Sequence, residues 1–169
     1  MQNNVFNSRI LPLKDKLFRL SLSIVGNRQD AEDVVQDALL HILNKSDHWH
    51  IINNIEAYCF RTVRNLALNV LSERDRQACS LQKNTDYSEA KNAEEQLSSN
   101  EEIRLIHQLI CQLPEKQKTI VQLRDVEGLS YKEISAVMEI SEEQVKVTLF
   151  RARQKIKDHF IAIYNYGIK

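Results

Sequence analysis

The chain has 169 residues, of which 43% are hydrophobic, and this is enough for one domain or for two small ones, each with a modest core. Its 23 basic residues balance its 23 acidic ones, which excludes a global basic field, so any binding of nucleic acid must depend on local patches of charge. With only 3 glycines, 2 prolines and no alternating strand-like runs, the sequence predicts an all-α fold.

Cysteine usage and hydropathy bear on the cell compartment. The sequence shows no secretory signal and no membrane-spanning run, and its three cysteines are widely separated. Such cysteines are typical of a reducing compartment without structural disulfides. His107 and Cys111 are four residues apart, but no second pair completes the four ligands of a zinc site. We therefore expect a cytoplasmic protein without a metal or cofactor.

The first half of the chain predicts three helices. A stripe of apolar residues from position 13 to position 24 marks the first helix, and Gly26 is suited to end it in a left-handed turn. Asn27 is suited to cap a second helix, which should reach about residue 44. Asn54 is suited to cap a long third helix that fades near residue 77.

A change of composition separates this half from the next. Residues 78–100 are polar, net acidic and nearly free of periodicity, which is typical of a linker. Apolar helical spacing resumes after it, with breaks at Pro114 and Gly128. The sequence thus predicts two small helical domains, residues 1–77 and 101–169, joined by this linker.

The second domain contains two helix starts in close succession. Ser130 with Glu133 and Ser141 with Gln144 each match a capping box, and their spacing forces a sharp corner between two short helices. Ser135 supplies the small residue that a helix-turn-helix needs inside its first helix, and an apolar stripe follows on the second. The pattern predicts a helix-turn-helix.

The second helix of this motif has an outward face, here named the recognition face. Its residues are Lys146, Val147, Phe150 and Arg151. Basic side chains can reach phosphates or guanine edges, and apolar ones can meet thymine methyls. Lys132 and Arg153 are expected to contact phosphates. The alternative is a helical hairpin with a solvated basic face. Glu142 and Glu143 begin the helix, where the positive end of the helix dipole stabilises their carboxylates.

Two segments resemble one family. The segment LPEKQKTIVQLRDVEGLSYKEISAVMEISEEQVKVTLFRARQKIKD resembles region 4 of the bacterial extracytoplasmic-function sigma factors. The stretch from LFRLSLSIVGNRQDAEDVVQDALLHIL through AYCFRTVRNLALNVL resembles their region 2. The resemblance implies a subunit, not an enzyme, that binds core RNA polymerase and directs promoter-specific initiation through melting of the minus-10 element and recognition of the minus-35 element.

The resemblance also implies roles for individual residues. The helix of DAEDVVQD docks on the beta-prime clamp helices of the polymerase, which assigns this contact to Asp33, Gln36 and Asp37. The FRTVRN segment implies that the minus-10 strand is held by Arg61, Arg64 and Asn65. In region 4 the family reads the minus-35 element with the recognition face. Glu139 stands where the family usually has glycine, so we expect a left-handed backbone there.

The implied partners are core RNA polymerase, promoter DNA and an anti-sigma factor, with no small-molecule substrate. The alternative is a stand-alone helix-turn-helix regulator of transcription that uses only the C-terminal domain. Such a regulator should carry a receiver or ligand domain in its N-terminal half, with alternating strands and helices and glycine-rich loops. The sequence shows no such pattern.

Overall fold

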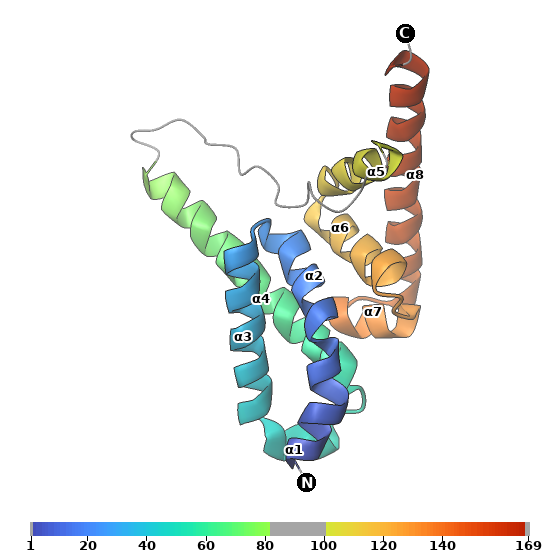
Figure 1. The fold of residues 1–169 in the computed structure, drawn as a ribbon. Coiled ribbons are helices and arrows are strands. Elements are labelled where there is room, and N and C mark those ends of the chain that lie inside the picture. The colour runs from blue at the N-terminus through green and yellow to red at the C-terminus, as the bar shows by residue number, and fades with distance from the viewer. Residues whose placement is uncertain (1, 82–100, 168–169) are drawn as a thin grey trace. The chain divides into compact units, whose positions relative to one another are not determined.

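The structure is a computed structural model, and it describes residues 2–81 and 101–167. Every element in these two ranges is a helix or a helical turn, which confirms the all-α prediction (Figure 1). The chain divides into two compact units, residues 1–93 and 94–169. Most of the predicted linker lies outside the described residues, and its residues 78–81 belong to a helix. The linker and its boundaries stay predictions.

Three long helices form the first unit, and each contacts the other two. They are α2 (Lys14–Val25), α3 (Arg28–Asn44) and α4 (Ile55–Leu81). As predicted, Gly26 ends α2 with a φ of 78°, and Asn27 begins α3 by accepting a hydrogen bond from the backbone N–H of Asp30 at 2.9 Å. Asn54 caps α4 in the same way, but this helix continues to Leu81 instead of fading near residue 77.

Helical structure begins earlier than the apolar stripe predicts. Three short elements precede α2: α1 (Gln2–Val5), the π-helical turn η1 (Phe6–Ile10) and the 3-10 turn η2 (Leu11–Leu13). Pro12 lies in the first turn of η2, a position at which proline is tolerated. Ile10, two residues before the proline, is fully buried.

The core of the first unit is closed at one end by Trp49. This residue lies in η3 (Ser46–Ile51), the 3-10 turn between α3 and α4, and it is buried. Its Nε1 donates a hydrogen bond to the carbonyl oxygen of Ile42 at 3.0 Å, and its ring stacks on Phe6. The turn is thereby tied to the end of α3 and to the N-terminal segment.

Cys59 lies in the same core. Burial, with a smaller contribution from the nearby Glu56 carboxylate, raises the pKa of its thiol to about 12. A thiol with such a pKa stays protonated at neutral pH, and a protonated thiol is a poor nucleophile. Cys59 is fully buried and packs in the core of the first unit.

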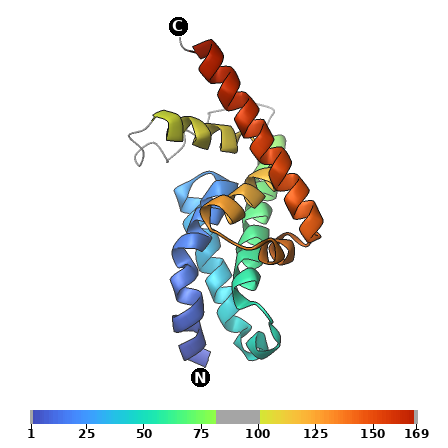
Figure 2. The same cartoon turned by 90° about the vertical axis from the view of Figure 1, so that its right-hand side faces the viewer.

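Between residues 101 and 167 the second unit contains four helices and one π-helical turn. They are α5 (Glu101–Cys111), α6 (Glu115–Val121), η4 (Gln122–Val126), α7 (Tyr131–Met138) and α8 (Glu142–Gly167). The long α8 contacts α5, α6 and α7, and Figure 2 shows it crossing the other three. None of the helices in the described ranges is both long and apolar enough to cross a membrane.

The corner between α7 and α8 has the predicted local geometry. Ser130 and Glu133 form a reciprocal capping box, and Ser141 and Gln144 form another, with hydrogen bonds of 3.0 and 3.2 Å. The Ser135 hydroxyl donates to the carbonyl of the turn residue Ile140. These bonds fix the entry of α8 relative to α7, so the helix-turn-helix is formed as the sequence indicated.

Glu139 occupies the turn with a left-handed backbone, φ 57° and ψ 42°, which confirms the expectation for this position. A side chain in this region costs about 1–2 kcal/mol, and glycine avoids the cost at the expense of a more flexible unfolded chain. We expect Glu139→Gly to raise the free energy of unfolding by up to about 1 kcal/mol, as measured by urea titration.

A matched control reverses the direction of this change. Gly128 also has a left-handed backbone, and a Cβ at that position would meet no atom within 4 Å. Gly128→Ala therefore changes backbone strain without a steric clash, and it should lower the free energy of unfolding by about 1 kcal/mol. If Glu139→Gly and Gly128→Ala changed the free energy of unfolding in the same direction, backbone conformation would not explain the two effects.

Candidate functional site

The recognition face lies on α8 and is open to solvent. Phe150 is 68% exposed and Val147 is 48% exposed, and Lys146 and Arg151 are exposed as well. The opposite side of the helix is buried in the second unit through Val145, Leu149 and Ala152. Two cations and two apolar side chains thus share a surface that can approach the major groove, where both kinds of contact are used.

The acidic start of α8 is explained by the helix terminus. Glu142 and Glu143 occupy the first turn. A hydrogen bond from its own backbone N–H lowers the pKa of the Glu143 carboxyl, and the Ser141 side chain and the Lys146 ammonium lower it further. The carboxylates therefore stabilise the exposed N–H groups of the helix, and the basic surface begins one turn later.

The two predicted phosphate contacts differ in their surroundings. Lys132 is exposed on α7. Arg153 is held by Asp125 of η4: its Nε donates to Asp125 Oδ2 at 3.2 Å, and its Nη2 donates to Asp125 Oδ1. This contact raises the pKa of the Arg153 guanidinium above its ordinary value. A phosphate would have to share or replace this pairing, so the role of Arg153 stays a prediction.

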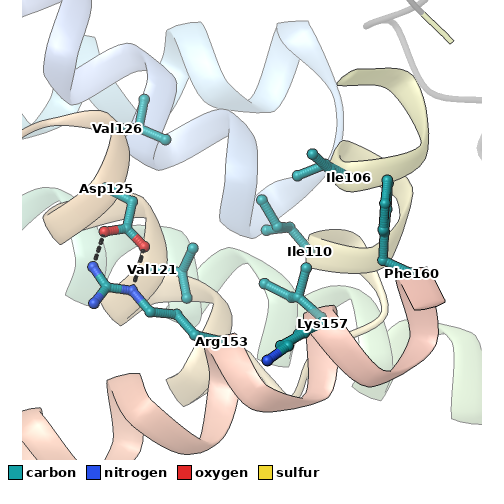
Figure 3. A pocket seen from close by; sticks show the side chains of 9 residues that line it. Ile106, Ile110, Val121, Asp125, Val126, Arg153, Lys157 and Phe160 are labelled. Carbon is teal, nitrogen blue, oxygen red and sulfur yellow. Dashed lines mark hydrogen bonds and ion pairs between the residues drawn. The ribbon is translucent and has the colours of Figure 1, made fainter. Parts of the chain in front are cut away.

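Beside this ion pair the second unit has an open hollow of about 350 Å³. Figure 3 shows Ile106 and Ile110 of α5 and Phe160 of α8 along it, with the Asp125–Arg153 pair at its edge. Further along α8, Phe160 stacks on Tyr164, whose hydroxyl donates to Glu102 of α5 at 3.3 Å. The apolar C-terminal segment therefore extends α8 and contacts α5.

In the first unit, the predicted polymerase contacts form one exposed face on α3, here named the acidic face. It consists of Asp33, Gln36 and Asp37. The other side of α3 is buried through Ala31, Val34, Val35 and Ala38. One turn beyond Asp37, Leu40 is 59% exposed and continues the same face. The face thus combines two carboxylates with an exposed apolar side chain.

The predicted minus-10 residues lie together on α4. Asn65 is exposed, Arg61 and Arg64 are half-buried, and Arg64 Nη1 donates to Asn65 Oδ1 at 3.4 Å. The Arg61 guanidinium lies over the ring of Tyr58, 5.9 Å from its centroid. Tyr58 is itself half-buried. The four side chains form a mixed basic and aromatic surface.

Arg74, further along α4, makes a structural contact that no pattern in the sequence predicted. Its Nη1 donates to the carbonyl oxygen of Val25 at 2.8 Å and lies 3.4 Å from Asp30 Oδ2. It thereby satisfies a carbonyl at the C-terminus of α2 and ties the end of α4 to the α2–α3 turn. No local sequence signal reveals this contact, because 49 residues separate the two partners.

Comparison with known proteins shows the same two parts in the same order. The family model described as "Sigma-70 region 2" matches residues 10–77, and the one described as "Sigma-70, region 4" matches residues 103–156. The ECF RNA polymerase sigma-E factor of Escherichia coli K12 is 32% identical over 139 residues, which are 75% of this chain and 72% of that protein. The RNA polymerase sigma-H factor of Pseudomonas aeruginosa is 29% identical over 161 residues, 89% of this chain and 83% of that protein.

Solved structures have the same fold. The sigma factor RpoE of Bartonella quintana, in complex with the anti-sigma factor NepR, matches with a TM-score of 0.76 and 22% identity, over 94% of this chain and 97% of that one. CnrH, in complex with the cytosolic domain of CnrY, matches with a TM-score of 0.69 and 20% identity, over 95% of this chain and 90% of that one. Since both regions and a relative above 30% identity agree, this chain belongs to the extracytoplasmic-function sigma factors of the sigma-70 family and functions in transcription initiation.

Proposed function

We propose that this sigma factor binds core RNA polymerase and directs it to a specific promoter by melting the minus-10 element and recognising the minus-35 element. Residues 1–77 act as region 2, residues 78–100 as a linker and residues 101–169 as region 4. The observation that carries the proposal is the exposure of the acidic face on α3 and of the recognition face on α8, each within the matching region.

The acidic face is the proposed contact with the beta-prime clamp helices of the polymerase. Asp33 and Asp37 are exposed one turn apart, so both can meet a basic partner surface at once. Carboxylates in such a position accelerate association and fix its register, and the neighbouring Leu40 supplies apolar area. The proposed contact therefore combines electrostatic steering with burial.

Arg61, Arg64 and Asn65 are the proposed contacts with the opened minus-10 strand. Their place on one surface of α4 supports this role, because arginines hold the backbone of a single strand and an amide can read a base edge. The Tyr58 ring beside Arg61 adds a flat surface on which a base can stack.

The remaining partners follow from the family. We propose an anti-sigma factor as regulator, supported by the complexes in which RpoE and CnrH were solved. The protein acts in the cytoplasm with the polymerase, and it supplies specificity while the polymerase performs catalysis. A stand-alone regulator is disfavoured because the N-terminal half matches region 2 instead of a receiver or ligand domain.

Run-off transcription tests the proposal directly. Purified core polymerase is incubated with a promoter library in the presence or absence of the full-length chain, and transcripts are sequenced from their 5′ ends. We expect specific starts, enriched for one pair of minus-35 and minus-10 sequences, only when the chain is present. Equal start patterns with and without the chain would overturn the proposal.

Arg151→Ala should weaken binding to the preferred minus-35 element by about 1–3 kcal/mol if the guanidinium makes a bidentate base contact. Holoenzyme binding to the preferred element and to single-base variants measures the effect. Lys132→Ala is the matched control. Since Lys132 is exposed on α7 as a proposed phosphate contact, its loss should weaken binding to all DNA sequences equally and reduce the slope of affinity against salt concentration by about one ion. A uniform loss for Arg151→Ala would identify Arg151 as a phosphate contact instead.

A further inference from the structure

Tyr131, the first residue of α7, has two cations over its ring. The Arg124 guanidinium carbon lies 4.8 Å from the ring centroid, and the Lys146 ammonium lies 5.6 Å from it. Both distances fall within the range in which the negative face of an aromatic ring attracts a cation. The two cations come from η4 and from α8. The ring therefore lies where three elements of the second unit meet.

Arg124 is fixed by a second contact. Its Nη1 donates a hydrogen bond of 2.7 Å to the carbonyl oxygen of Leu129, which lies in the loop before α7. The guanidinium is thus held between this carbonyl and the ring of Tyr131, and its long side chain loses much of its freedom. Arg124 in turn restrains the tyrosine ring on the side of η4.

Lys146 is the first residue of the recognition face and has a flexible stem. The carboxylate of Glu143, one turn earlier on α8, attracts the Lys146 ammonium and competes with DNA for it. A lysine side chain that moves freely before binding loses rotamer freedom when it contacts DNA. A ring that already confines the ammonium reduces this loss and fixes the direction from which it approaches the DNA.

We propose that Tyr131 is a positioning residue for minus-35 recognition: its ring holds the Lys146 ammonium at the start of the recognition face. Tyr131 thus contributes to base preference through Lys146 and not through a DNA contact of its own. The proposal rests on the proposed function, in which Lys146 reads the minus-35 element. It adds a residue from outside the recognition face that sets how that face is presented.

A double-mutant cycle with the holoenzyme tests the proposal. The variants are Tyr131→Leu, Lys146→Ala and the two together, and binding is measured on the preferred minus-35 element and on its single-base variants. We expect Tyr131→Leu to weaken binding to the preferred element about two- to fivefold, the size of an exposed cation–π contact. In the Lys146→Ala background the same substitution should have no further effect, since its target is gone.

Tyr131→Phe is the matched control, because it keeps the ring and removes the hydroxyl. It should bind like the unaltered protein, whereas a loss equal to that of Tyr131→Leu would mean that the hydroxyl contacts DNA, and would overturn the proposal. Thermal unfolding checks that Tyr131→Leu folds normally. If it does not, Tyr131→Met replaces it in the cycle, since its flexible side chain can refill the site.

The outcomes separate this inference from the proposed function. Equal effects of Tyr131→Leu in both backgrounds would overturn the positioning role while leaving minus-35 recognition by Lys146 intact. If Lys146→Ala instead left both affinity and base preference unchanged, the assignment of Lys146 to recognition would fail, and the positioning role with it. A base preference that shifts only when Lys146 is present supports both.

Discussion

We expect Asp33→Arg together with Asp37→Arg to weaken binding to core RNA polymerase about 100-fold or more. Both carboxylates are exposed on the acidic face of α3, and reversal of their charge places like charges opposite a basic partner, which costs several kcal/mol. The substitutions face solvent, so the helical fold should be kept. Core binding is measured by titration of labelled protein with polymerase, and folding by circular dichroism.

The control for this prediction must change the net charge equally. Asp15→Arg with Asp75→Arg does so, since both residues are exposed in the first unit, on α2 and α4. This pair should leave core binding within about threefold of the unaltered protein, because the two carboxylates lie on other helices than the acidic face and exposed charges are screened at physiological salt. Equal losses in the two double variants would assign the effect to net charge and not to the acidic face.

The second large effect is expected in the core. Phe60 of α4 is 1% exposed, and Phe60→Ala should lower the free energy of unfolding of the first unit by about 3–5 kcal/mol. The chain has a single tryptophan, Trp49, which lies buried in this unit. Tryptophan fluorescence during a urea titration therefore reports on the unit that carries the substitution.

Phe150→Ala makes the same chemical change on the surface. At 68% exposure it should alter the free energy of unfolding by no more than about 0.5 kcal/mol, measured by circular dichroism because Trp49 lies in the other unit, yet weaken binding to the minus-35 element. The pair separates a phenylalanine that holds the fold from one that is available to DNA. A similar loss of stability in both variants would show that Phe150 packs against the protein and is not free to read a base.

The local features of the fold were largely predictable. The caps at Asn27, Ser130 and Ser141 were correct because each capping bond spans three residues, within the reach of a pattern in the sequence. The left-handed turn at Glu139 was predicted from the resemblance, and it follows from the short distance between two helix starts. The N-terminal helical turns were not predicted, because the apolar stripe that marks the first helix begins only at position 13.

The side chains that surround the candidate site were less predictable. Arg153 was predicted to contact phosphate, but its guanidinium bonds to Asp125, 28 residues away. Arg74 bonds to the carbonyl of Val25, a contact that no sequence pattern indicated. The aromatic ring over which Arg124 and Lys146 lie is also contributed by a different element. Charge patterns show which side chains are polar, and they do not show which of these have partners.

The sequence by itself determined the helical class, the positions of the helix caps, the helix-turn-helix and the membership of a sigma factor family. These features depend on the helical period and on bonds between residues three or four apart, which the order of residues already contains. Only the tertiary structure decided which basic side chains are held within the protein, and that Tyr131 lies beside Lys146. Those contacts join residues of different elements, and the distances between them exist only once the helices have packed together.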